Sequence, residues 1–164
     1  GLMCPMIDTA EDVRRFVGAC RYPPRGYRSF GPQRARLYSE GDYFQTANEE
    51  VLAFAMVETA AAVDNLDDIA AVPELDGLFI GPYDLSVSLG LARLADVRDP
   101  ALRRVLDRVL AVCARHDLIP AVYTGSMETG AFLAELGFRL VTVGQDTGLL
   151  EMEAKKQVEG WLKR

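Results

Sequence analysis

The sequence contains few of the residues that most often bind zinc or form covalent intermediates. It has one histidine, His116, and three cysteines, none of which are paired in a C-x-x-C spacing. This composition argues against a zinc site built from His and Cys. The lysines, Lys155, Lys156 and Lys163, fall in the last predicted helix or directly after it, so no lysine follows a predicted strand, where a Schiff base would form. The odd cysteine count indicates a reducing compartment, and we expect the cytoplasm.

Long hydrophobic runs are absent as well. No apolar stretch approaches the roughly 18 to 20 residues that span a bilayer, and no charged segment followed by an apolar one opens the chain. Acidic residues outnumber basic ones, which gives a formal net charge of -6 and a pI of about 4.8. We therefore expect no nucleic-acid partner and no membrane partner. An acidic enzyme that holds a cation fits this charge better.

The chain does contain a regular alternation of strand-like and helix-like segments. Residues 51–57 (VLAFAMV) form a continuous apolar run of the kind that is buried on both faces of a parallel sheet. A helix begins after Thr9, a predicted N-cap, and ends before Tyr22 because two prolines follow. The other predicted strands are 1–7, 77–80, 119–123 and 139–143; the other predicted helices are 42–50, 60–71, 100–115, 127–136 and 149–162; residues 81–86 are predicted to form a loop.

This alternation predicts an α/β fold with a parallel sheet and right-handed crossovers. At 164 residues the chain is expected to form a single domain, 1–164. A complete (β/α)8 barrel usually needs about 250 residues. We therefore expect the C-terminal portion of a TIM-type barrel, about five β/α units, with the N-terminal units absent from this sequence. The alternative is a five-stranded open sheet.

Two carboxylates follow consecutive predicted strands. Glu58 comes directly after the run 51–57, and Asp84 lies four residues after the strand 77–80. Because the carboxyl ends of parallel strands meet on one face, both groups are predicted to lie at the same mouth of the sheet. Two hard oxygen ligands with room for water suit Mg²⁺ or Mn²⁺. The same segment contains Gly81 and Pro82, and the N–H groups of its loop are suited to holding a small carboxylate.

Each of these residues also has a purely structural interpretation. Glu58 would be a solvated residue ahead of an N-cap at Thr59, and Asp84 would cap a turn that starts at Ser86. Gly81 would then serve only the turn. Their coincidence at matching strand ends favours the functional interpretation.

Several motifs resemble the HpcH/HpaI aldolase family, the 2-keto-3-deoxy sugar acid and 4-hydroxy-2-oxo acid aldolases. The segment MVETA at 56–60 is followed by LDGLFIGPYDLS at 75–86. RYPPRGYR at 21–28 and VTVG at 141–144 are similar to the family as well, and the resemblance runs in register from residue 1 to about 150.

The resemblance implies specific roles for residues of this chain. In the family, the Glu of the E-T motif and the Asp of G-P-x-D-L-S bind a divalent metal, Mg or Mn and in some cases Co; here these are Glu58 and Asp84. The loop with Pro82, Tyr83 and Asp84 would bind the carboxylate of pyruvate through backbone N–H groups. Met56 occupies a position where several members place a substrate-binding Gln. Its thioether cannot donate a hydrogen bond, so small or less hydroxylated aldehydes are expected.

The resemblance also identifies what this chain does not contain. Family members carry a catalytic His and an Arg that stabilises the transition state on strands earlier than the first residue here, so no catalytic residue of that kind is expected within the chain. His116 does not replace that His, because it ends a predicted helix ahead of the strand 119–123, on the opposite side of the sheet. A charge at a helix C-terminus is the expected role of His116.

The implied reaction is reversible cleavage of a 4-hydroxy-2-oxo acid to pyruvate and an aldehyde, in which the metal acts as a Lewis acid. Two other functions stay open. One is that of an acyl-CoA lyase from the citrate lyase β-subunit or malyl-CoA lyase branch, which shares the Glu and Asp pair. The other is a non-catalytic, oligomer-forming piece. The family exchanges C-terminal helices between subunits, so the segment 149–162 predicts a homo-oligomer.

Overall fold

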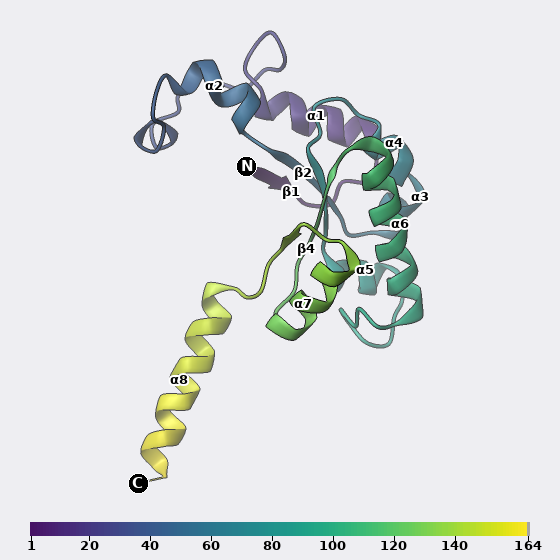
Figure 1. Ribbon diagram of the computed structural model, residues 1–164, viewed down its shortest axis with the longest axis vertical. Coiled ribbons are helices and arrows are strands. Elements are labelled where there is room, and N and C mark those ends of the chain that lie inside the picture. Colours follow the sequence, from purple (N-terminus) through teal and green to yellow (C-terminus); the bar gives the residue numbers. More distant parts are fainter. Residues whose placement is uncertain (164) are drawn as a thin grey trace.

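The computed structural model describes residues 1–163 and is built on a five-stranded sheet (Figure 1). All neighbouring strands are parallel, and their order in space follows the sequence, β1-β2-β3-β4-β5. A doubly wound sheet would reverse its order at a switch point. The unreversed order is that of a segment of a barrel wall, so it agrees with the predicted partial TIM-type barrel and not with a doubly wound sheet. The strands are β1 (Leu2–Cys4), β2 (Ala53–Val57), β3 (Gly77–Ile80), β4 (Ile119–Val122) and β5 (Leu140–Val141).

The helices begin and end at recognisable sequence signals. The side chain of Thr9 accepts a hydrogen bond from the N–H of Asp12, and Asp12 in turn caps Thr9, which closes a capping box. At Gly137 the backbone has φ +118°, a conformation that favours glycine and ends a helix. The helices are α1 (Ala10–Cys20), the 3-10 turn η1 (Ala35–Leu37), α2 (Tyr43–Glu50), α3 (Ala60–Asp64), α4 (Leu66–Ala70), α5 (Pro82–Ser88), α6 (Pro100–His116), α7 (Met127–Leu136) and α8 (Asp146–Leu162).

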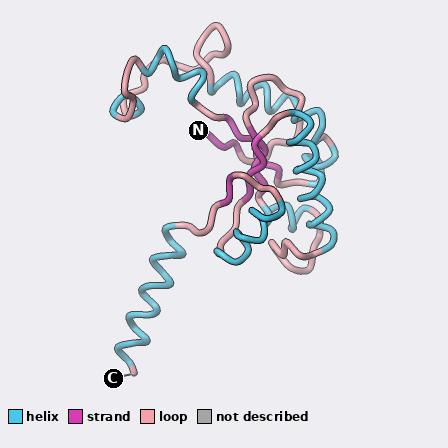
Figure 2. The backbone as a smooth tube through the Cα atoms, viewed as in Figure 1, coloured by secondary structure: helices cyan, strands magenta, loops and turns pink. Residues whose placement is uncertain are grey.

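The two faces of the sheet differ in what covers them. Val57, Ile80 and other residues of one face join the main core together with side chains of α1, α4 and α6. Figure 2 shows these helices along one side of the strands. The other face contains a second cluster made only of residues in or next to strands. Its members are Leu52, Phe54, Met56, Phe79, Ile119, Ala121 and Tyr123.

Several predicted boundaries are wrong for identifiable reasons. β1 ends at Cys4 because Pro5 has no N–H for the ladder and Met6 adopts a positive φ of 55°. The predicted helix 60–71 is broken at Asn65, whose side chain donates to the backbone oxygen of Asp8. Most of the predicted loop 81–86 is instead the start of α5, which begins at Pro82 with Gly81 as its N-cap. The last strand contains only Leu140–Val141, and the last helix begins at Asp146 rather than at residue 149.

The C-terminal helix α8 projects away from the rest of the molecule (Figure 1). None of its residues is buried. Within residues 1–163 no helix combines the length and apolarity needed to cross a bilayer.

A buried arginine ties the amino ends of β2 and β3 to the end of α1. The side chain of Arg21 is 3% exposed and donates to the Glu74 carboxylate at 3.1 Å and to the Asp76 carboxylate at 2.8 Å. It also donates to the backbone oxygens of Glu74, at 3.0 Å, and Val51. The same Asp76 oxygen accepts the N–H of Ala53 at 2.7 Å. The arginine therefore bridges both strands where they begin.

Replacing Arg21 by methionine should destabilise the protein by about 3–5 kcal/mol, because the partner carboxylates lose their buried counter-charge. The measurement is the free energy of unfolding in urea. Arg14→Met is the matched control, since its ion pair with Glu11 is exposed and should cost less than about 1 kcal/mol. Equal losses in the two variants would contradict a special role for Arg21.

Candidate functional site

A cleft of about 390 Å³ opens at the carboxyl ends of β2 and β3. Five residues that the sequence predicts for metal or substrate binding, Met56, Glu58, Pro82, Tyr83 and Asp84, all line it. The structure thus places both carboxylates at one mouth of the sheet, and their role as metal ligands stays a prediction. Phe79, Gly81, Tyr123 and Gln145 complete the lining.

Glu58 is held in the cleft by groups from three segments. It follows β2 directly and is 5% exposed, so it is not the solvated residue of the structural interpretation. Its Oε2 accepts the N–H of Met6 at 3.0 Å. A Cβ built on Gly81 would lie 2.4 Å from its Oε1, so only glycine leaves room for the carboxylate there. Among the described residues no group donates to Oε1, which leaves that oxygen available to a ligand.

Asp84 lies in the first turn of α5, which starts directly after β3. Pro82 occupies the first turn, where its fixed φ favours helix initiation and its missing N–H costs nothing. Asp84 does not cap a turn at Ser86: the Ser86 hydroxyl donates to the backbone oxygen of Pro82 at 2.6 Å and accepts the N–H of Ala95 at 3.0 Å. The Asp84 side chain is exposed, and no described residue forms a hydrogen bond or ion pair with it. Its charge is uncompensated within residues 1–163.

The remaining lining is apolar and comes from the strands. Met56 lies opposite Phe79 in the β2–β3 register, and Phe79 lies opposite Ala121 in the β3–β4 register. Side chains two apart on a strand share a face, so Met56 and Glu58 point into the same cleft. Glu58 and Asp84 thus lie at the edge of an apolar surface that includes Met56 and Phe79.

Three cleft contacts were missed by sequence reasoning. The N–H of Met6 reaches Glu58 because the chain turns through a positive φ after β1, and nothing in a methionine signals that conformation. Gln145 was detectable, since it follows a predicted strand just as Glu58 does. Tyr123 was assigned to a strand, but it directly follows β4 and packs edge-on against Tyr83 with ring centroids 6.1 Å apart.

The charged groups of the cleft are both carboxylates, and no histidine or cysteine lines it among the described residues. No group of three or more His, Cys, Asp or Glu side chains able to hold a metal exists in the described part of the chain. His116 ends α6, just before β4 begins, whereas the cleft lies beyond the carboxyl end of that strand. The prediction that His116 lies on the side of the sheet opposite the site is therefore confirmed. Two carboxylates alone match a hard cation that retains water ligands.

Comparison with known proteins agrees with this architecture. A hydroxypyruvate/pyruvate aldolase of Rhizorhabdus wittichii is 37% identical over 96% of this chain and 63% of its own length. A 4-hydroxy-2-oxo-heptane-1,7-dioate aldolase of Shigella flexneri is 33% identical over 94% of this chain and 58% of its own length. The crystal structure of an HpcH/HpaI aldolase/citrate lyase family protein from Burkholderia cenocepacia superimposes with a TM-score of 0.81 at 34% identity, covering 99% of this chain and 64% of the other.

The chain therefore spans about 58–64% of the length of these relatives. The profile of the HpcH/HpaI aldolase/citrate lyase family matches residues 1–152, which include all five strands and the whole cleft. By sequence and by fold, this chain belongs to the HpcH/HpaI aldolase/citrate lyase family.

Proposed function

We propose that this chain provides the metal-binding and pyruvate-binding half of a class II aldolase, which cleaves 4-hydroxy-2-oxo acids to pyruvate and an aldehyde. The observation that carries the proposal is the pair Glu58 and Asp84, which line one cleft at the ends of neighbouring parallel strands. The aldolase names of relatives at 33–37% identity support the same reaction class.

The cleft fits a divalent cation such as Mg²⁺ or Mn²⁺. Glu58 offers an oxygen that no described residue occupies, and the Asp84 carboxylate has no counter-charge. Hard cations prefer carboxylate oxygens and fill their other positions with water and substrate. When bound, the cation supplies Lewis-acid polarisation of the 2-oxo group. The described residues supply no third His, Cys, Asp or Glu ligand, which leaves positions for a chelating substrate.

The start of α5 is suited to the substrate carboxylate. The N–H groups of Tyr83 and Asp84 belong to the first turn of that helix and have no intrahelical acceptor. Partial positive charge at the start of a helix favours an anion. Met56 and Phe79 exclude water from the other side of the bound pyruvate.

Proton transfer at the C4 hydroxyl needs a base besides the two carboxylates. No histidine lines the cleft within residues 1–163. We therefore assign the removal of the C4 hydroxyl proton to a water molecule or to a group outside this stretch. The acyl-CoA lyase alternative uses the same carboxylate pair. The aldolase relatives and the G-P-Y-D-L-S segment favour the aldolase reaction.

The substitution Asp84→Asn should weaken Mn²⁺ binding by about tenfold or more, because the amide lacks the charge that attracts a hard cation. Calorimetric titration with Mn²⁺ measures the affinity. Asp146→Asn is the control, since Asp146 is also exposed in the first turn of a helix but does not line the cleft. Unchanged affinity in Asp84→Asn, or an equal loss in both variants, would refute the metal site.

Incubation with Mn²⁺, pyruvate and acetaldehyde should yield 4-hydroxy-2-oxopentanoate, and EDTA should abolish its formation. The protein tested is the complete gene product that contains this chain. Chromatography with mass detection measures the product. Cleavage of malyl-CoA without any aldol product would instead support the acyl-CoA lyase alternative.

We propose further that α8 mediates a homo-oligomer. Leu150, Ala154, Val158 and Leu162 recur every four residues and form one apolar stripe. The helix is exposed along its whole length, and its apolar side chains are not covered by the body of the protein. An exposed apolar stripe of this kind is typical of helix-mediated assembly.

The double substitution Leu150→Lys with Val158→Lys should produce a smaller assembly, because buried charge opposes helix packing. Light scattering coupled to size-exclusion chromatography measures the mass. Met152→Lys with Gly160→Lys adds the same charge at the same spacing on the opposite face of the helix and should leave the assembly unchanged. A monomeric wild type, or equal masses for both variants, would contradict the proposal.

A further inference from the structure

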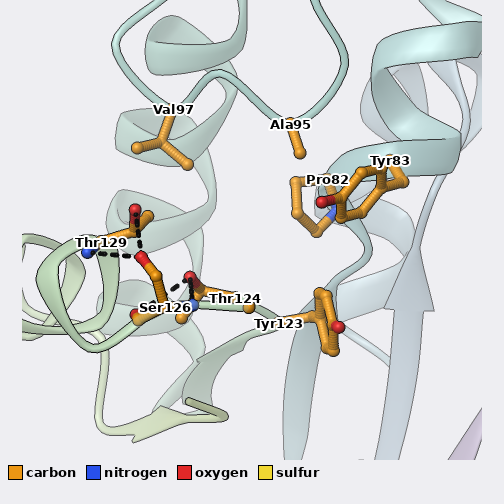
Figure 3. Close-up of a pocket in the computed structure, with 9 residues that line it drawn as sticks. Pro82, Tyr83, Ala95, Val97, Tyr123, Thr124, Ser126 and Thr129 are labelled. Carbon is orange, nitrogen blue, oxygen red and sulfur yellow. Dashed lines mark hydrogen bonds between the residues drawn. The ribbon is translucent and has the colours of Figure 1, made fainter. Parts of the chain in front are cut away.

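A second cavity, of about 260 Å³, lies beside the cleft between the segments that follow β3 and β4 (Figure 3). Thr124, Ser126 and Thr129 form one wall, and Ala95 and Val97 from the loop after α5 form another. We call it the hydroxyl chamber. At about 30 Å³ per water molecule it holds some eight waters, enough for a chain of three or four carbons with a terminal hydroxyl.

The hydroxyl chamber and the cleft share a boundary. Pro82, Tyr83 and Tyr123 line both cavities. The two tyrosine rings pack edge to face with centroids 6.1 Å apart, and Tyr83 is half exposed. A substrate anchored at Glu58 and Asp84 would therefore extend past this pair into the chamber.

The wall of the chamber can recognise a hydroxyl group. Ser126 and Thr129 share one hydrogen bond of 3.0 Å between their side chains, and the Ser126 oxygen already accepts the N–H of Thr129. Two hydroxyls that share one bond leave one O–H without an acceptor. Thr124, which is 4% exposed, fixes the segment by accepting the N–H of Ser126. The remaining O–H can donate a hydrogen bond to an alcohol, and the lone pairs of the two hydroxyl oxygens can accept one from it.

The chamber is unsuited to a charged group. None of its lining side chains is ionisable except that of Tyr83 and Tyr123. The nearest hollow does contain Arg98 and Glu128, but these form an ion pair with each other at 3.3 Å. A carboxylate in the chamber would find no cationic side chain to pair with.

We propose that the hydroxyl chamber binds the far end of the acceptor aldehyde and selects a neutral chain with a hydroxyl at C3 or C4. This inference rests on the proposed aldolase function and adds its substrate class. Beside Glu58 the cleft presents the Met56 thioether, which donates no hydrogen bond, and the serine and threonine hydroxyls line the chamber instead. Recognition of the hydroxyl at the far end of the aldehyde is therefore assigned to the chamber.

The test compares pairs of aldehydes that differ by one group in the Mn²⁺-loaded complete gene product. With pyruvate as donor, kcat/KM for 4-hydroxybutanal should exceed that for butanal by about fivefold, the effect of one hydrogen bond. Succinic semialdehyde, which ends in a carboxylate, should react more slowly than both. Thr129→Val should abolish the preference, and Thr46→Val on the exposed surface of α2 should retain it. The ratio of the two kcat/KM values does not change if part of the protein is unfolded, because the loss of active enzyme lowers both values equally.

Nuclear magnetic resonance provides a readout that needs no turnover. With Mg²⁺ and pyruvate present, 1,4-butanediol should shift the amide signals of Ser126 and Thr129 more than butan-1-ol does, and Thr129→Val should remove the difference. Equal shifts for the two alcohols, shifts confined to other segments, or equal kcat/KM values would overturn the proposal. Loss of Mn²⁺ binding alone would instead count against the aldolase function, because the diol titration still reports on the chamber.

Discussion

The parallel pairing of β2 with β3 is the constraint on which the cleft depends. Val57 pairs with Ile80, so the residues that follow, Glu58 and Gly81, leave the sheet side by side. Because Gly81 has no Cβ, the Glu58 carboxylate occupies the space that any other residue would fill. A register shift of one residue would turn Glu58 toward the helices and remove one carboxylate from the cleft.

The fold class and the positions of Glu58 and Asp84 could be predicted from periodicity, whereas Met56 was identified only through the resemblance to the family, and Pro82 and Tyr83 through that resemblance together with the chemistry of their loop. Buried strands alternate with amphipathic helices, and polar residues at strand ends gather on one face. The local backbone conformation was harder to predict from the sequence. Residues 81–86 were predicted as a loop because glycine and proline favour turns, whereas Pro82 at the first position of a helix favours α5 equally well. The hydrogen bond between Met6 and Glu58 depends on the positive φ of Met6, which cannot be predicted from a methionine in the sequence.

The chemistry of the cleft changes with distance from the carboxylates. Met56 and Phe79 form an apolar floor beside the proposed metal ligands, where exclusion of water strengthens the attraction between a cation and its substrate. Serine and threonine hydroxyls line only the chamber, beyond the Tyr83–Tyr123 pair. Such a gradient separates the part of the site that would activate the 2-oxo acid from the part that would recognise the aldehyde.

Charges are paired at the amino ends of β2 and β3 and unpaired at their carboxyl ends. At the amino ends, Arg21 neutralises Asp76 and Glu74, and the hydrogen bond from Arg25 to Glu74 holds the pKa of that carboxyl below its usual range. At the carboxyl ends, Glu58 and Asp84 lie together without a cationic partner among the described residues. The ion pairs of Arg21 therefore join the two strands at one end, while the carboxylates at the other end are left free to attract a cation.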